Sequence, residues 1–131
     1  MNVLEVSSLA LAYLGDSIYE SYIREYLIKK GISHVNDLQV ESLNYVSAKS
    51  QRIILERLID ENILTEEELD IVKKGRNAKM HKSKNTDIIT YHKATGFECL
   101  IGYLYQKNEK RLNEIMEKVL WEYVEKMYLM N

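Results

Sequence analysis

Residues 9–28 are the most apolar stretch of the chain, and one Gly-Asp pair, Gly15-Asp16, interrupts it. The sequence has no proline and is rich in Leu, Ile, Glu and Lys, which is typical of a helical protein, so this stretch predicts a long helix. A carboxylate within an apolar helix is costly unless it is paired or faces water. Asp16 is therefore expected to have a bonded partner, to face a cleft or to hold a metal ion.

The expected helix has two different sides. It should start after a cap at Ser7 or Ser8 and stop at Gly31. Its strongest apolar line, which should face the core, consists of Leu11, Leu14, Ile18 and Tyr22. A second line at i, i+4 spacing consists of Ala12, Asp16 and Glu20. The second side of the helix therefore carries small and acidic side chains.

The rest of the sequence also predicts helices. The expected ranges are 38–62, in one or two pieces broken at Asn44-Tyr45, then about 65–75, 87–106 and 109–129. Asn36 or Asp37 can cap the first of these. The interior of 38–62 should contain Leu43, Val46, Ile53, Ile54, Leu58 and Ile59, and the last helix carries a stripe of Leu112, Ile115, Met116, Val119, Tyr123 and Met127. No segment alternates with the period of a strand, so we expect one all-α domain over residues 1–131.

Residues 94–105 form a second apolar stretch with a single carboxylate, Glu98. One face of its helix carries Thr95, Glu98, Gly102 and Tyr105. A crossing of the two helices through Gly15 and Gly102 would let their backbones approach closely, and Asp16 and Glu98 would then meet. Two carboxylates at close range repel unless a proton or a cation lies between them. Mg²⁺ is the natural cytosolic candidate, because it takes oxygen ligands and needs only one or two protein carboxylates.

Alternatives remain open for each of these acids. Asp16 and Glu98 could be isolated buried acids that bind backbone groups or tyrosine hydroxyls. Glu20 could be a third, outer-sphere carboxylate, or a solvated residue that pairs with Arg24 at i+4.

A basic segment lies at residues 73–84, although the net charge of the chain is only −2. It contains Lys73, Lys74, Arg76, Lys79, Lys82 and Lys84, and no acid. The rest of the chain has 12 basic residues against 20 acidic ones, a remainder of −8. Such a segment is either a local anion site or a solubilising loop. Its density is enough to neutralise several phosphates.

The sequence also argues against several classes of protein. The one cysteine, Cys99, cannot form an internal disulfide, which favours a reducing, cytoplasmic location. No secretory signal and no apolar stretch long enough to span a membrane is evident, so no membrane partner is expected. The histidines lack a second ligand at metal-binding spacing.

Several motifs in order resemble the ribonuclease III family. The segment LAYLGDSIYE is similar to the family's most diagnostic helix, and FECLIGYLY is similar to its second acidic helix. SAKSQ at 47–51, GRNAK at 75–79, NTD at 85–87, Tyr91 and the final helix extend the likeness over about residues 8–125. More narrowly, the chain resembles the bacterial Mini-III ribonucleases, which consist of the catalytic domain alone.

The resemblance implies an all-helical ribonuclease III endonuclease-domain-like fold, a two-fold homodimer, and Mg²⁺-dependent cleavage of double-stranded RNA, with Mn²⁺ as a substitute. Asp16 and Glu98 match the family's catalytic, metal-binding acids. In larger members two further acids complete the site, and here those positions are Ala12 and Thr95, as in the Mini-III pattern. One tightly held Mg²⁺ is therefore expected rather than two, and no small-molecule cofactor.

The resemblance also bears on RNA binding. The chain has no room for the family's separate double-stranded-RNA-binding domain, so the catalytic domain must hold the duplex. We assign this role to Lys73, Lys74, Arg76, Asn77, Lys79, Lys82 and Lys84. A-form RNA presents phosphates and 2′-hydroxyls, which suits a basic loop. The implied natural substrate is a bacterial precursor of large-subunit (23S) ribosomal RNA. The rival interpretation is a non-catalytic RNA-binding or ribosome-associated domain of the same fold.

Overall fold

The computed structural model describes residues 6–78 and 87–130, and every regular element in these ranges is helical. The elements are α1 (Ser8–Lys29), α2 (Val35–Val46), α3 (Ala48–Asp60), α4 (Glu66–Asn77), α5 (Ile88–Lys107), α6 (Glu109–Lys118), the π-helical η1 (Val119–Val124) and α7 (Glu125–Met130). The all-α prediction is confirmed. None of the helices in the described ranges is long and apolar enough to cross a membrane.

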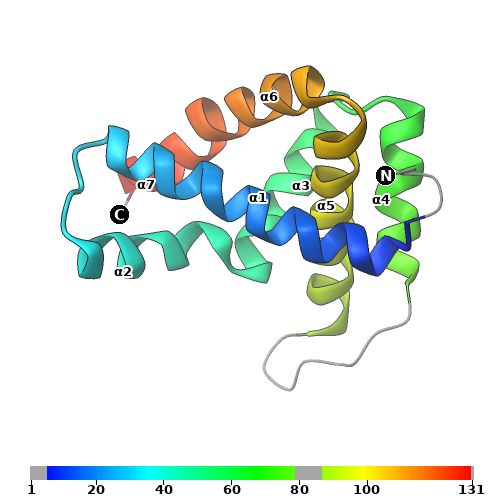
Figure 1. The fold of residues 1–131 in the computed structure, drawn as a ribbon, viewed down its shortest axis with the longest axis horizontal. Helices are drawn as coiled ribbons and strands as arrows, with labels where there is room; N and C mark the ends of the chain where they lie inside the picture. The colour runs from blue at the N-terminus through cyan, green and yellow to red at the C-terminus, as the bar shows by residue number, and fades with distance from the viewer. Residues whose placement is uncertain (1–5, 79–86, 131) are drawn as a thin grey trace.

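Helix α5 lies at the centre of the fold, and α1 crosses it (Figure 1). Helix α4 packs along one side of α5, and α3 packs on another. The C-terminal helix, from α6 to α7, runs back along α1, where Glu125 accepts hydrogen bonds from Tyr26 and from Lys30, the latter at 2.7 Å. Three helices thus surround α5, and its side chains are buried along most of its length.

Helix α1 begins and ends where the sequence predicts. The Ser7 Oγ accepts a hydrogen bond from the backbone N–H of Ala10 at 3.1 Å. At the other end Gly31 adopts a φ of 102°, a left-handed conformation that favours glycine. This turn lets the N–H of Ile32 bond the carbonyl of Leu27 at 3.2 Å.

Two boundaries in the second helical region differ from the prediction. Helix α2 starts before Asn36 and has no side-chain cap, so the caps expected at Asn36 and Asp37 are wrong. Asp37 lies instead in the first turn, where its charge is favoured by the helix dipole. The break falls at Ser47 rather than at Asn44-Tyr45, because the Ser47 Oγ caps α3 by accepting from the Ser50 N–H at 3.2 Å.

The core face of α1 is not the apolar line expected from the sequence. Its buried residues are Leu11, Ala12, Gly15, Tyr19, Ile23, Tyr26 and Leu27. Of the expected line only Leu11 is buried, and Leu14, Ile18 and Tyr22 are half-buried. The cause is the close crossing with α5, which turns Gly15 inward, and Tyr19 and Ile23 lie on the same face of α1.

The expected interior of α2 and α3 is also only partly correct. Ile54 and Leu58 are fully buried, whereas Leu43 on α2 is 65% exposed. Ile53 and Ile59 are exposed as well, at 41% and 39%, because α3 buries only the face that meets α5. In the C-terminal helix the predicted stripe is confirmed: Leu112, Ile115, Met116, Val119 and Tyr123 are buried, and Met127 is half-buried.

Four tyrosines are fully buried, and the hydroxyl of each donates a hydrogen bond. Tyr19 donates to the Tyr45 carbonyl at 2.8 Å, Tyr45 to Glu41 at 2.6 Å, Tyr123 to Glu61 at 3.0 Å, and Tyr26 to Glu125. Tyrosine adds large apolar area to a core, and a bonded hydroxyl avoids the cost of burying a polar atom. The tyrosine-rich core therefore specifies which helices pack together.

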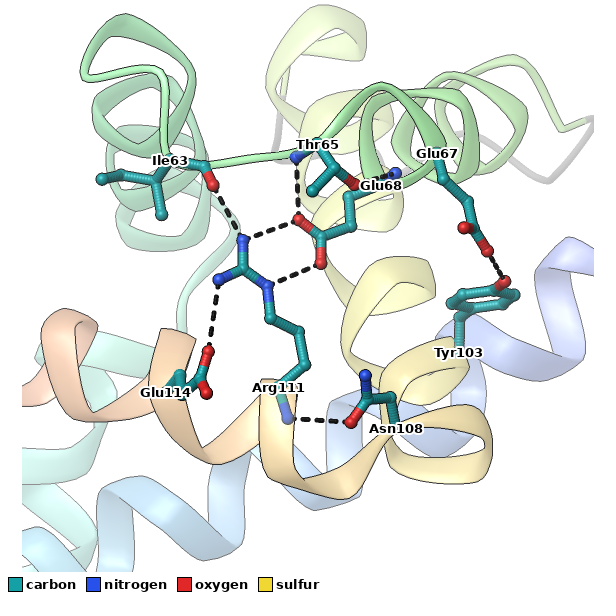
Figure 2. Close-up of polar contacts among 8 residues, drawn as sticks. All are labelled: Ile63, Thr65, Glu67, Glu68, Tyr103, Asn108, Arg111 and Glu114. Atoms are coloured by element: carbon teal, nitrogen blue, oxygen red, sulfur yellow. Dashed lines mark hydrogen bonds and ion pairs between the residues drawn. The ribbon is translucent and has the colours of Figure 1, made fainter.

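An ion pair joins α6 to α4 below the surface (Figure 2). Arg111 donates from Nε to Glu68 at 2.8 Å and from Nη2 to the other oxygen of Glu68 at 2.9 Å, and Nη2 also donates to the Ile63 carbonyl at 2.8 Å. Glu68 accepts from the Thr65 N–H at 2.9 Å, and Thr65 caps α4 in return, so the predicted capping box is confirmed. Glu68 is only 5% exposed.

We expect Glu68→Gln to lower the free energy of unfolding by about 3 kcal/mol at neutral pH, because it leaves the Arg111 guanidinium without its buried partner. Burial alone would raise the pKa of Glu68, but the bonds from Arg111 and Thr65 outweigh it and hold that pKa below the ordinary 4.5. The ionised carboxylate therefore stabilises the fold above pH 4.5, and this stabilisation is lost as the pH falls through the lowered pKa.

Urea unfolding of the wild type and the variant over a range of pH measures this. The difference in free energy of unfolding between the two proteins should shrink as the pH is lowered. A difference that stays constant well below pH 4.5 would show that the Glu68 carboxylate does not stabilise the fold through its charge. The control is Glu67→Gln, which alters an exposed pair with Lys107 beside the same cluster and should cost much less stability than Glu68→Gln.

Candidate active site

Helices α1 and α5 touch through two glycines. A Cβ placed on Gly15 would lie 1.8 Å from the backbone oxygen of Glu98, and one on Gly102 would lie 2.0 Å from the backbone oxygen of Leu11. Real Cβ atoms do not approach other atoms this closely. The prediction that Gly15 and Gly102 allow a close crossing is therefore confirmed.

This crossing brings the carboxyl groups of Asp16 and Glu98 within hydrogen-bonding reach of each other. Asp16 follows Gly15 on α1 and is exposed, whereas Glu98 on α5 is mostly covered. Burial and the neighbouring Asp16 carboxylate raise the pKa of Glu98 to about 8. A second negative charge at this point is thus unfavourable in the metal-free protein, and a bound cation would remove that cost.

Gln51 on α3 is the third polar residue of the site. Its Nε2 donates to Glu98 Oε2 at 3.3 Å and to the Val46 carbonyl at 3.3 Å. The sequence interpretation used Gln51 only as part of a family motif. The signal that could have identified it is a polar residue on the buried face of α3, in line with Ile54, Leu55 and Leu58.

The other expected site residues lie apart from this pair or lack a carboxylate. Glu20 forms an exposed ion pair with Arg24 at 3.3 Å, as the i, i+4 spacing suggests, and an outer-sphere role for it stays a prediction. Ala12 and Thr95 are each 6% exposed, and the Thr95 hydroxyl donates to the Tyr91 carbonyl at 2.9 Å. Within the described ranges no group of three or more His, Cys, Asp or Glu residues could hold a metal ion.

The donors that are present suit a hard cation with few protein ligands. Asp16 and Glu98 offer carboxylate oxygens, and the buried Gln51 Oε1 has no hydrogen-bond partner within the described part of the chain. Mg²⁺ binds through one or two carboxylates and keeps several waters. The residues therefore fit a single Mg²⁺.

Part of the expected RNA-binding segment lies at the end of α4. Lys73, Lys74, Arg76 and Asn77 occupy its last two turns and are exposed. In the parts of the chain that the structure describes, neither Lys73 nor Lys74 forms a salt bridge. Lys79, Lys82 and Lys84 lie outside the described residues.

An open groove of about 770 Å³ runs between the start of α1 and the end of α4. Its lining includes Ser7, Ser8, Leu9, Asp70, Lys73, Lys74 and Asn77. No acid occupies the first turn of α1, so the positive end of its dipole adds to the two lysines. The groove therefore favours anions. Asp16 lies further along α1, the helix whose first residues line the groove.

A family model described as the ribonuclease III domain matches residues 9–109. The chain belongs to the ribonuclease III family. Within this family it is similar to Mini-ribonuclease 3 of Staphylococcus aureus, with 46% identity over 88% of this chain and 87% of that protein. It is also 47% identical to Mini-ribonuclease 3 of Enterococcus faecalis, over 86% of each chain.

A solved structure has the same fold. The crystal structure of a Fusobacterium nucleatum protein matches with a TM-score of 0.77 and 33% identity, covering 88% of this chain and 93% of that one. The sequence-based identification as a ribonuclease III family member of the Mini-III type is confirmed, and with it the fold. As a member of this family, the protein is an endoribonuclease.

Proposed function

We propose that the protein cleaves double-stranded RNA in a Mg²⁺-dependent reaction, with Asp16 and Glu98 holding the cation. The observation that carries this proposal is the close contact between α1 and α5. It leaves two neighbouring carboxyl groups, one at an exposed position and one at a half-buried position. When bound, Mg²⁺ supplies an activated water and positive charge for the phosphate. Mn²⁺ has similar ligand preferences and should substitute.

The residues of this chain position the reactants. Glu98 is fixed from two sides, by the helix contact behind it and by the Gln51 amide. Asp16 faces solvent, so a phosphodiester can approach from that side. No serine, cysteine or histidine is needed as a covalent nucleophile, and Cys99 is buried with a raised pKa caused by that burial.

One assay tests the proposal and separates it from the rival interpretation. Purified protein is incubated with duplex RNA in Mg²⁺ or in EDTA, and the products are sized. Fragments that form only with Mg²⁺ support the proposal. An intact but retarded band would indicate a binding domain without catalysis, and fragments in EDTA would exclude a role for the cation.

The basic groove is the proposed path of the duplex. Lys73 and Lys74 project from α4 into it, and we assign Arg76, Asn77, Lys79, Lys82 and Lys84 to the same RNA-binding surface. These cations can contact the phosphates of an A-form helix without reading its bases.

We expect Lys73→Glu/Lys74→Glu to weaken binding to duplex RNA and to reduce the slope of log K against log salt by about two, because two phosphate contacts are lost. Fluorescence anisotropy at several salt concentrations, in Ca²⁺ or EDTA to prevent cleavage, measures this slope. Lys29→Glu is the control, since Lys29 pairs with Glu25 at the far end of α1. An unchanged slope in the double variant would remove the groove from the interface.

Three further proposals complete this function. Exposed apolar side chains on α2, namely Val35, Val40 and Leu43, support a two-fold homodimer, because a partner would cover them. A monomeric mass by sedimentation at micromolar concentration would contradict it.

The natural substrate is proposed to be a precursor of large-subunit (23S) ribosomal RNA in the bacterial cytoplasm, and accumulation of that precursor on depletion of the protein tests it.

A further inference from the structure

Gln51 is a buried polar residue that contacts the proposed metal site. It is 2% exposed, less than any other described polar residue apart from tyrosine. Its side chain lies against Glu98, one of the two proposed metal ligands. A glutamine in this place is therefore either a link within the fold or a part of the site.

The orientation of the Gln51 amide follows from its neighbours. The Val46 carbonyl and Glu98 Oε2 are both acceptors, so only the NH₂ group can face them. Both bonds use Nε2, and the amide cannot be flipped without losing them. Oε1 must therefore point elsewhere, and it is buried with no hydrogen-bond partner among the described residues.

Such an arrangement is unfavourable in the protein alone. A buried amide oxygen without a partner costs about 1–3 kcal/mol. An apolar side chain such as leucine would cover this apolar face of α3 without that cost. The polar atom is therefore expected to have a role next to the carboxylates.

We propose that Gln51 is a positioning residue of the metal site. Nε2 holds the Glu98 carboxylate, and Oε1 accepts a hydrogen bond from a water molecule in the shell of the Mg²⁺ bound by Asp16 and Glu98. This inference rests on the proposed function. Mg²⁺ retains several waters, all of them donors, and Ala12 and Thr95 offer no carboxylate to receive them. Gln51 supplies a neutral acceptor from α3 instead.

The test uses the full chain and Gln51→Leu, with Mn²⁺ as the probe. Removal of a second-shell partner typically weakens metal binding 10- to 100-fold, so we expect the Mn²⁺ dissociation constant, measured by electron paramagnetic resonance, to rise by about that factor. Cleavage of duplex RNA should fall at low Mg²⁺ and recover as Mg²⁺ is raised. Affinity for the RNA in EDTA should not change.

Ser50→Ala is the matched control for a purely structural role. Ser50 precedes Gln51 on α3 and its hydroxyl donates to the Asn44 carbonyl at 2.5 Å, so it also ties α3 to α2 but does not touch Glu98. Ser50→Ala should lower the melting temperature in EDTA, because it breaks this bond, and should leave Mn²⁺ affinity unchanged. Only Gln51→Leu should weaken Mn²⁺ binding.

Gln51→Glu gives a second, opposite readout that also serves if Gln51→Leu does not fold. A third carboxylate repels the first two in the metal-free protein and attracts a cation. We therefore expect a lower melting temperature in EDTA but a larger rise on adding Mg²⁺ than in the wild type. A structural link alone would give both variants the same Mg²⁺ response as the wild type.

The outcomes separate this inference from the proposed function. If the Gln51 variants bind Mn²⁺ as tightly as the wild type while Asp16→Asn binds it weakly, the role of Gln51 is wrong and the proposed metal site still stands. Wild-type Mn²⁺ affinity in Asp16→Asn overturns the metal site and the Gln51 role with it. Weak binding in Gln51→Leu together with a stronger Mg²⁺ response in Gln51→Glu supports the inference.

Discussion

We expect Asp16→Asn and Glu98→Gln each to abolish cleavage of duplex RNA while the protein stays folded and binds RNA. Each change keeps the shape of the side chain and removes one ionisable carboxyl ligand from the pair at the α1 and α5 crossing. A bound cation stabilises the transition state by several kcal/mol. Since 1.36 kcal/mol corresponds to a factor of ten, we expect at least about a thousandfold loss in rate.

Time courses with labelled duplex RNA in Mg²⁺ measure the rate, and mobility shifts in EDTA measure binding. Glu25→Gln is the control, because Glu25 is an exposed carboxylate on the same helix and its salt bridge within the described residues is with Lys29. Cleavage by either site variant at the wild-type rate would show that the carboxylate pair is not the metal site.

Gly15→Ala or Gly102→Ala should prevent stable folding. In both cases the new Cβ would meet a backbone oxygen, at 1.8 Å and 2.0 Å, and a backbone cannot swing aside as a flexible side chain can. The helices must separate, which loosens the packing of α1 on the central helix. We expect a loss of more than about 3 kcal/mol, a large part of the stability of an ordinary domain.

Urea unfolding followed by circular dichroism measures this loss. Gly31→Ala is the matched control: no atom lies within 4 Å of its Cβ position, and only the positive φ opposes the change. Its cost should stay near 1–2 kcal/mol. Equal losses at Gly15 and Gly31 would mean that the helix contact does not hold the fold together.

The sequence predicted the helices well, because caps and breakers act locally. Three helix ends lie where they were expected. Helix α1 starts after Ser7 and ends before Gly31, and α4 starts at the capping box of Thr65 and Glu68. The pair of Asp16 and Glu98 was also predictable, since two glycines in apolar helices suggested a close crossing.

The predictions that failed are those that depend on which faces of the helices pack together. Hydrophobicity favours Leu14, Ile18 and Tyr22 as the core line of α1. The crossing with α5 instead buries a neighbouring face, which carries Gly15, Tyr19 and Ile23. Gln51 was missed for the same reason. Its importance comes from Glu98, which belongs to a different helix far along the chain, and no local pattern shows that contact.

The crossing also has a consequence for the cell that makes the protein. The ribosome synthesises the N-terminal half of the chain first, and that half carries Asp16 but not Glu98. The carboxylate pair exists only after α5 has been synthesised and has docked on α1. Nascent, truncated or unfolded chains therefore lack the proposed nuclease centre.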